Sequence, residues 1–316
     1  MSVKVVVGAG GAGVATAELL ADSGHEVRLI TRRGSGPSHP QIRRIAVDAS
    51  KTDELMGALK GVTTLYNCAA PPYHLWRTRL PALASGMLNA AIAAGADYVM
   101  LGNLYGYGPV TGSITEHSPL KPNSIKGELR AEVWMQAKAA HDAGRVRATE
   151  VRASDFIGRG AISVFTIMVA PKVLAGKTAL FPADLDAPHS WTGTVDAARA
   201  LVAAGADERS WGRPWHVPTN PAVSPRQLAT VLADCARVGA PKLRRMPGWL
   251  LAAAALGSKV VRELPEMQYQ LQKPFVMDSS ETVHTFGLTP TALDEILHDG
   301  LSHGRGPIAT ARGTRS

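Results

Sequence analysis

Short apolar runs alternate with amphipathic stretches along the first half of the chain. The apolar runs, each suited to a buried strand, cover 3–7, 26–31, 45–47, 64–67, 98–101 and 148–151. Stretches with a helical spacing of apolar residues fall between them, at 14–21, 53–60, 80–94 and 124–143. Because parallel strands are joined through helices, this alternation predicts an α/β fold, a doubly wound parallel sheet with helices on both faces.

The second half of the chain is less regular and is interrupted by prolines. Helical patterns recur at 195–204, 225–238 and 247–262, without the regular strands of the first half. We expect a larger domain over 1–160 and a smaller one over 161–301. The last segment, 302–316, is basic and rich in glycine, and we expect it to be a disordered tail.

The composition is that of a globular protein, with 45% hydrophobic and 19% charged residues among 316. The net charge of +8 comes from scattered basic residues without a basic stripe, so no nucleic-acid partner is expected. The apolar run 249–256 is too short to cross a bilayer, so we expect a buried helix and no membrane partner. Two distant cysteines, Cys68 and Cys235, and the lack of a signal-peptide pattern predict a cytoplasmic protein. No zinc-type motif occurs, so no metal site is expected.

A glycine-rich turn follows the first strand and opens the first helix. Its glycines are Gly8, Gly10, Gly11 and Gly13, which include the spacing GxGxxG. In this context the first glycine allows a tight turn, the second lets a pyrophosphate approach the backbone, and the last lets the helix pack on the strand. Free amides at the helix N-terminus favour an anion. The turn therefore predicts a Rossmann-type domain that binds a dinucleotide.

The residues after the second strand bear on which dinucleotide binds. NAD sites usually have an acid there, which binds the ribose hydroxyls. This chain has Arg32 and Arg33 and no acid. Guanidinium groups match a 2′-phosphate, so we expect NADP(H); the alternative is that both arginines are solvated loop residues.

Several segments together resemble the extended short-chain dehydrogenase/reductase family, in its epimerase/dehydratase branch, over residues 3 to about 300. They are the glycine turn and the segments 47–49, 67–70, 105–109, 151–158 and 189–196. The resemblance implies that Asp48 and Ala49 contact the adenine and that Ala69 and Ala70 line the cofactor. It also implies that segments near 190–217 return to the larger domain, that the smaller domain binds substrate, and that the protein can form a homodimer.

The same resemblance implies a catalytic Ser or Thr, a Tyr and a Lys, the last two spaced as YxxxK. In the family the phenol exchanges a proton with the substrate, and the lysine lowers the pKa of the phenol. The corresponding positions here are Asn103, Lys126 and Arg130, so the usual relay is absent. A second alignment places the pair in the middle of the long helix, at 134 and 138. The YxxxK at 269–273 lies far beyond the expected place, and we interpret it as coincidence.

Three hypotheses for the function follow from these substitutions. The first is an NADP(H)-dependent oxidoreductase, or an isomerase or dehydratase on the same fold, that acts on a small molecule. In it Lys126 is the acid and a cofactor ligand, Arg130 lowers its pKa, Asn103 binds an oxyanion, and Tyr105 or Tyr107 supplies a phenol. The second is a non-catalytic NADP(H)-binding sensor or regulatory protein. The third is a vestigial, structural cofactor site.

Aromatic and histidine residues outside these motifs have two interpretations each. Tyr73, His74 and Trp76 follow the fourth strand, on the side where ligands bind in open α/β sheets, and they either touch substrate or pack in a loop. His189 and Trp191 are expected to pack at the junction of the domains rather than to react.

Overall fold

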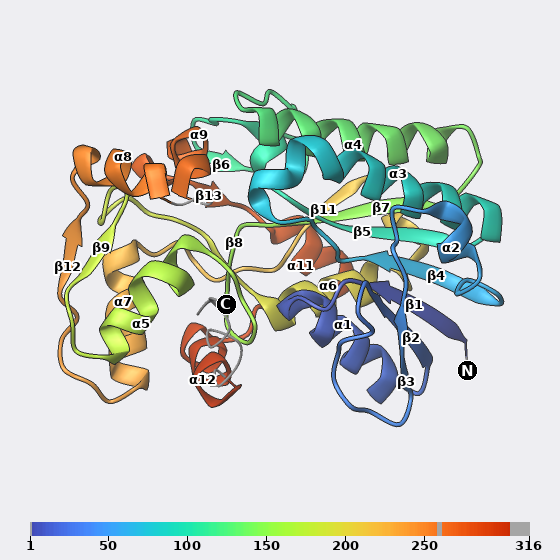
Figure 1. Ribbon diagram of the computed structural model, residues 1–316, viewed down its shortest axis with the longest axis horizontal. Helices are drawn as coiled ribbons and strands as arrows, with labels where there is room; N and C mark the ends of the chain where they lie inside the picture. The colour runs from blue at the N-terminus through green and yellow to red at the C-terminus, as the bar shows by residue number, and fades with distance from the viewer. Residues whose placement is uncertain (1, 258–260, 304–316) are drawn as a thin grey trace, which may run out of the picture.

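The computed structural model describes residues 2–257 and 261–303. A parallel sheet of seven strands lies between layers of helices and forms a Rossmann-type α/β fold (Figure 1). The α/β fold expected from the sequence is therefore confirmed. From one edge to the other, the strands are β11 (Pro214–His216), β7 (Ala148–Ala153), β5 (Asp97–Asn103), β4 (Val62–Asn67), β1 (Val3–Val7), β2 (Glu26–Thr31) and β3 (Ile42–Ala46).

Helices cover both faces of this sheet, one layer above it and one below in Figure 1. The upper layer holds α2 (Thr52–Met56), α3 (Trp76–Ala94) and α4 (Ile125–Asp142), and the lower layer holds α1 (Gly11–Asp22) and α6 (Thr194–Ala204). Each layer buries its apolar side chains against the sheet, as Trp134 of α4 and Leu20 of α1 do. Ser124 caps α4, because its hydroxyl accepts the amide of Gly127 at 3.0 Å.

The strand order reverses next to β1, and this reversal positions the ligand cleft. β1 pairs with β2 on one side and with β4 on the other, so that Val7 lies between Ile30 and Asn67. The connections leave the carboxyl ends of β1 and β4 in opposite directions. A crevice opens where such connections diverge, at the carboxyl ends of the strands.

The second half of the chain builds a smaller lobe, at the left of Figure 1. The strands outside the main sheet form three short pairs: β8 (Asp155–Ile157) with β10 (Trp191–Gly193), β9 (Ala179–Phe181) with β12 (Leu243–Arg245), and β6 (Ser113–Ile114) with β13 (Val276–Met277). The remaining helices are α5 (Ala170–Leu174), α7 (Pro225–Cys235), α8 (Gly248–Gly257), α9 (Leu264–Met267), α10 (Tyr269–Gln272), α11 (Ser280–Phe286) and α12 (Leu293–His303). The segment 194–216 returns to the large lobe, since α6 packs on α1 and β11 pairs with β7.

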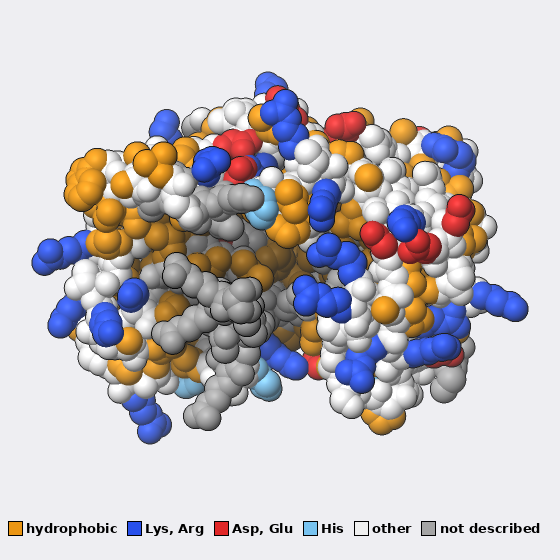
Figure 2. Space-filling view, viewed as in Figure 1, with side chains coloured by type: hydrophobic (Ala, Val, Ile, Leu, Met, Phe, Trp, Pro, Cys, Tyr) orange, Lys and Arg blue, Asp and Glu red, His pale blue; other side chains and the backbone are white. Residues whose placement is uncertain are grey.

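Helix α8 is apolar but only partly buried. Leu251 is 7% exposed, whereas Trp249 is 72% and Leu256 is 84% exposed. Figure 2 shows hydrophobic side chains gathered over α8, at the upper left of the molecule. The expectation of a buried helix was therefore wrong for the outer side of α8. No helix among the described residues is long and apolar enough to span a membrane.

The C-terminal tail expected at 302–316 begins inside a helix. Ser302 and His303 are the last residues of α12, and 304–316 lie outside the described residues.

Candidate active site

A cleft of about 920 Å³ runs along the carboxyl ends of the central strands. It starts at the glycine turn after β1, where Ala69 and Ala70 also line it, and it reaches the ends of β5 and β7. Side chains of the smaller lobe, among them Gln270 and Phe275, close its other end. The cleft thus joins a turn suited to phosphate with a polar end formed between the two lobes.

The glycine turn forms the floor of one arm of the cleft. Gly8 has a φ of +103°, and a Cβ at Gly13 would lie 2.1 Å from the carbonyl oxygen of Gly8, so both positions require glycine. A Cβ at Gly10 would meet no atom of the described chain within 4 Å. Gly10 is also the N-cap of α1 and gives the first-turn amides no side-chain partner. The open space at Gly10 and the uncapped helix N-terminus fit a pyrophosphate. Gly11 instead packs against the chain, because a Cβ there would lie 2.5 Å from the carbonyl oxygen of Arg159.

Arg32 and Asp48 lie farther along the same arm and line the cleft together with Ala49. Ser50 donates its amide and its hydroxyl to Asp48 Oδ1, over 3.1 and 2.7 Å. These hydrogen bonds hold the pKa of the Asp48 carboxyl below its usual range. Arg33 is exposed and is not among the described residues that line the cleft. Of the two arginines expected to bind the dinucleotide, the structure brings only Arg32 to the cleft.

Asn103, Tyr105 and Arg130 meet at the opposite end of the cleft. Asn103 Oδ1 accepts the amide of Tyr105 at 3.2 Å. The guanidinium of Arg130 lies over the ring of Trp76, 4.4 Å from its centre, and donates to the carbonyl of Leu101 at 3.4 Å. Its buried Nε has no partner within the described chain. A cation with an unused donor therefore faces the cleft where the family resemblance implies a lysine.

The Tyr105 hydroxyl is held by two donors. It accepts hydrogen bonds from Tyr73 and from Gln270. Burial, assisted by the charge of Asp155, nevertheless raises the pKa of Tyr105 to about 12. The rings of Tyr73 and Trp76 lie 6.4 and 6.1 Å from that of Tyr105, so the loop aromatics do form a wall of the cleft. Tyr105 is thus a well-oriented phenol that stays neutral.

Lys126 differs from its expected position. It lies in the first turn of α4, but it is not among the described residues that line the cleft. Its buried ammonium binds Glu263 and lies 2.6 Å from Glu266 Oε2, and its Nζ lies 4.9 Å from the ring centre of Tyr73. The two carboxylates bind the ammonium group and hold it away from the cleft. The structure therefore gives no support to Lys126 as the acid or as a cofactor ligand.

Residues without an expected role complete the polar end. Asp155 and Ser154 line the cleft after β7, and the buried hydroxyl of Ser154 has no partner in the described chain. His189 Nε2 lies 3.1 Å from Asp155 Oδ2. The hydroxyl of Tyr269 is also buried without a described partner, and it lies near Tyr105 and Asp155. Asp155, the acid within the segment 151–158, was the one sequence feature that indicated these polar residues.

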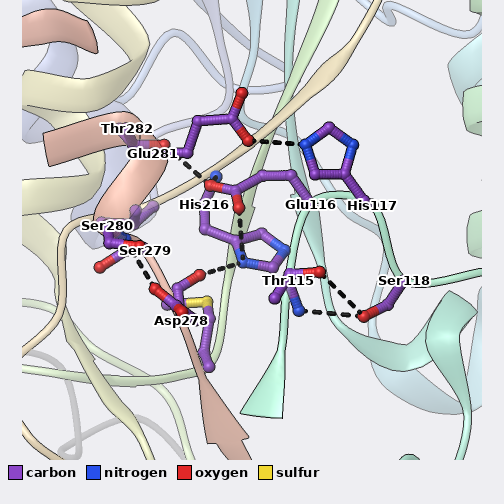
Figure 3. Close-up of polar contacts among 12 residues, drawn as sticks. Thr115, Glu116, His117, Ser118, His216, Asp278, Ser279, Ser280, Glu281 and Thr282 are labelled. Atoms are coloured by element: carbon purple, nitrogen blue, oxygen red, sulfur yellow. Dashed lines mark hydrogen bonds and ion pairs between the residues drawn. The ribbon is translucent and has the colours of Figure 1, made fainter. Parts of the chain in front are cut away.

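Tyr107, the other candidate phenol, belongs to a separate buried network and does not line the described part of the cleft. Its hydroxyl lies 2.9 Å from His216 Nε2, and His216 Nδ1 lies 2.6 Å from the carbonyl oxygen of Asp278. Glu116 Oε1 accepts from the His216 amide and from Thr282, each at 3.1 Å (Figure 3). This network joins β11 to the loop before α4 and to α11, and we interpret it as structural.

Comparisons with known proteins agree with this geometry. A family model described as the NAD dependent epimerase/dehydratase family matches residues 5–216. The search of curated proteins found no match.

Several solved structures share the fold. The dTDP-glucose 4,6-dehydratase DesIV from Streptomyces venezuelae, solved with NAD and TYD bound, superposes with a TM-score of 0.77 at 19% identity, over 96% of this chain and 97% of that one. A UDP-glucose 4-epimerase from Thermotoga maritima, solved with UDP-glucose, gives 0.76 at 16% identity, over 96% and 99%. WbmH from Bordetella bronchiseptica, solved with NAD+, gives 0.73 at 17% identity, over 96% and 99%.

Proposed function

The chain belongs to the NAD-dependent epimerase/dehydratase family, and we propose that it is an enzyme that reduces a carbonyl group of a small molecule, or oxidises the corresponding alcohol. One observation carries this proposal: the open glycine turn and the polar end formed by Asn103, Tyr105 and Arg130 line a single cleft. A nicotinamide dinucleotide bound there supplies the hydride donor or acceptor. The orphaned donors at Arg130 and Ser154 fit a polar ligand at this end, because buried polar groups usually have partners.

The chain's own residues have distinct tasks in this function. Gly10 and the N-terminus of α1 bind the pyrophosphate, and Asp48 binds the adenine through the carboxylate oxygen that Ser50 leaves free. Tyr105 donates a hydrogen bond to the substrate oxygen, because Tyr73 and Gln270 already occupy its acceptor side. Arg130 stabilises negative charge that develops on that oxygen. The aromatic wall of Tyr73 and Trp76 excludes water from the reacting atoms.

We further propose a preference for NADP(H). Arg32 lines the cleft at the end of β2, and Arg33 follows it with an exposed side chain that can swing to a 2′-phosphate. DesIV and WbmH were solved with NAD and NAD+ bound, so the preference rests on these two arginines alone.

Calorimetric titration with NADPH and with NADH tests both the binding of a dinucleotide and the preference for NADP(H). The wild-type protein is expected to bind NADPH more tightly, and the Arg32→Asp/Arg33→Ala variant is expected to lose that preference. Equal affinities in the wild type would remove the NADP(H) assignment, and binding of neither dinucleotide would remove the proposed function. Arg226→Ala is the matched control, because Arg226 pairs with Asp186 on the surface and is not among the described residues that line the cleft.

A further inference from the structure

His189 is a buried histidine whose ring orientation is fixed. It is 2% exposed, and its ring centre lies 4.5 Å from that of Trp191 and 5.6 Å from that of Phe275. Nδ1 lies 3.1 Å from the backbone carbonyl oxygen of Gln270. A carbonyl oxygen can only accept, so Nδ1 carries a proton.

The other ring nitrogen of His189 faces a carboxylate. Nε2 lies 3.1 Å from Asp155 Oδ2, and it has no hydrogen-bond partner in the described chain. An unprotonated Nε2 would set its lone pair beside a negative oxygen. A proton on Nε2 turns the contact into an ion pair that a small rotation of the carboxylate aligns. The geometry therefore places a proton on Nε2, between the ring and the carboxylate.

Asp155 connects this ion pair with the cleft. Its carboxylate is 15% exposed and lines the polar end, whereas the imidazole behind it is sealed from solvent. The phenols of Tyr73, Tyr105 and Tyr269 face Asp155 from three different elements. The pKa of each phenol is raised above its usual value, mainly by burial and in part by the charge of Asp155. These phenols hold their protons and are poor proton donors.

We infer that Asp155 and His189 together hold the proton that this enzyme exchanges with its substrate oxygen, in place of the family's missing tyrosine. Asp155 is the catalytic residue, because it touches the cleft, and His189 is a positioning residue that stores the proton. This inference rests on the proposed function for its substrate. The protonation of His189 does not depend on that function and can be tested separately.

The step balances without a further reactant. In the reduction, a nicotinamide held in the cleft would supply a hydride to the carbonyl carbon, and the π electron pair would move to the oxygen. The Asp155 carboxylate takes the Nε2 proton of His189 and passes it to that oxygen, so that the O–H bond forms as the N–H bond breaks. The pair is left as a carboxylate and a neutral imidazole, and water restores its proton through Asp155. Oxidation of the alcohol reverses each transfer.

Nitrogen-15 NMR of the histidine rings in the full-length protein tests the proton store without a substrate, with His189→Gln used for assignment. At pH 7 we expect protons on both ring nitrogens of His189, and Asp155→Asn should leave a proton only on Nδ1. A wild-type His189 with a bare Nε2 would overturn the inference, even if the variants failed to fold.

Turnover of phenanthrenequinone, an aromatic diketone suited to the aromatic wall, tests the role in catalysis. Asp155→Asn should lower kcat by about 100-fold or more. In the wild type, kcat should fall with rising pH as the pair loses its stored proton, and Asp155→Asn should abolish this fall. The NADPH affinity of the variant, measured by calorimetry, should stay within about threefold of the wild type. Asp155→Glu should recover part of kcat. Retained turnover in Asp155→Asn, or a large loss of NADPH affinity, would overturn the inference. No turnover by the wild type would count against the proposed function for such ketones, and the His189 spectrum would still decide the proton store.

Discussion

The ammonium of Lys126 lies 2.6 Å from Glu266 Oε2, and the backbone amide of Lys126 donates to Glu266 Oε1 at 2.9 Å. Glu263 binds the same ammonium, so one lysine joins the start of α4 to the segment that carries Gln270 into the cleft. The Lys126 side chain is 4% exposed, whereas the side chains of Glu263 and Glu266 are 27% and 25% exposed. The ion pair is therefore partly desolvated, and removing one of its partners costs more than it does at a surface pair.

Lys126→Met is expected to destabilise the protein and to leave dinucleotide binding in place. Removing the ammonium leaves two carboxylates close together, at a cost of about 2–4 kcal/mol in the free energy of unfolding. Chemical denaturation measures this cost, and calorimetry should show NADPH affinity changed by less than about threefold. Lys51→Met is the matched control, since Lys51 pairs with Glu54 on the surface and should cost below about 1 kcal/mol. A large loss of NADPH affinity with unchanged stability would instead make Lys126 a cofactor ligand.

Gly10→Ala is expected to separate ligand binding from folding. A Cβ at Gly10 meets no described atom within 4 Å and its φ is −75°, so stability should fall by no more than about 1 kcal/mol. The same methyl group would occupy the space proposed for the pyrophosphate, so NADPH affinity should fall by about tenfold or more. Thermal unfolding and calorimetry measure the two effects. Unchanged affinity in Gly10→Ala would place the phosphates elsewhere.

The sheet could be predicted because its signals are local. β2 has the predicted bounds, and Ser124 caps α4 as expected, since an apolar run and a capping hydroxyl act within a few residues. The strand β3 was predicted too short, at 45–47 against Ile42–Ala46. It is an edge strand, where Arg43 and Arg44 are exposed, so its first half lacks the apolar pattern.

The polar end of the cleft could not be predicted in the same way. Lys126 and Glu266 lie 140 residues apart, and nothing local to either residue indicates the contact. His189 was expected only to pack, and it does pack on Trp191, but its approach to Asp155 depends on the pairing of β8 with β10. Helix α8 was misjudged because a run that is apolar on every side has no periodicity from which to infer an exposed face.

Tyr105→Phe is expected to weaken the handling of substrate without affecting the dinucleotide. Tyr105 lines the cleft and its hydroxyl is oriented by Tyr73 and Gln270, so loss of the hydroxyl removes one donor to the substrate oxygen. We expect kcat/KM for phenanthrenequinone to fall by about 10- to 100-fold, with NADPH affinity unchanged. Tyr107→Phe is the control, because that phenol binds His216 outside the described cleft lining and should change stability only. Equal kinetic effects of both variants would argue against a role for Tyr105.

The buried His216 should make stability depend on pH. Burial, assisted by the charge of Arg152, lowers the pKa of His216 to about 3, so the folded protein keeps this imidazole neutral. In the unfolded chain it titrates near its ordinary pKa of about 6.5. Between these values the unfolded state binds one proton more, so the contribution of His216 is present above pH 6.5 and is lost as the pH falls. From pH 7 to 4.5 the loss is roughly 2–3 kcal/mol.

Burial raises the pKa of the neighbouring Glu116, which acts in the opposite direction, so the wild type must be compared with His216→Gln. Denaturant unfolding at both pH values should show a drop that is smaller in His216→Gln by about this amount. Equal drops in the two proteins would mean that His216 does not control the acid stability.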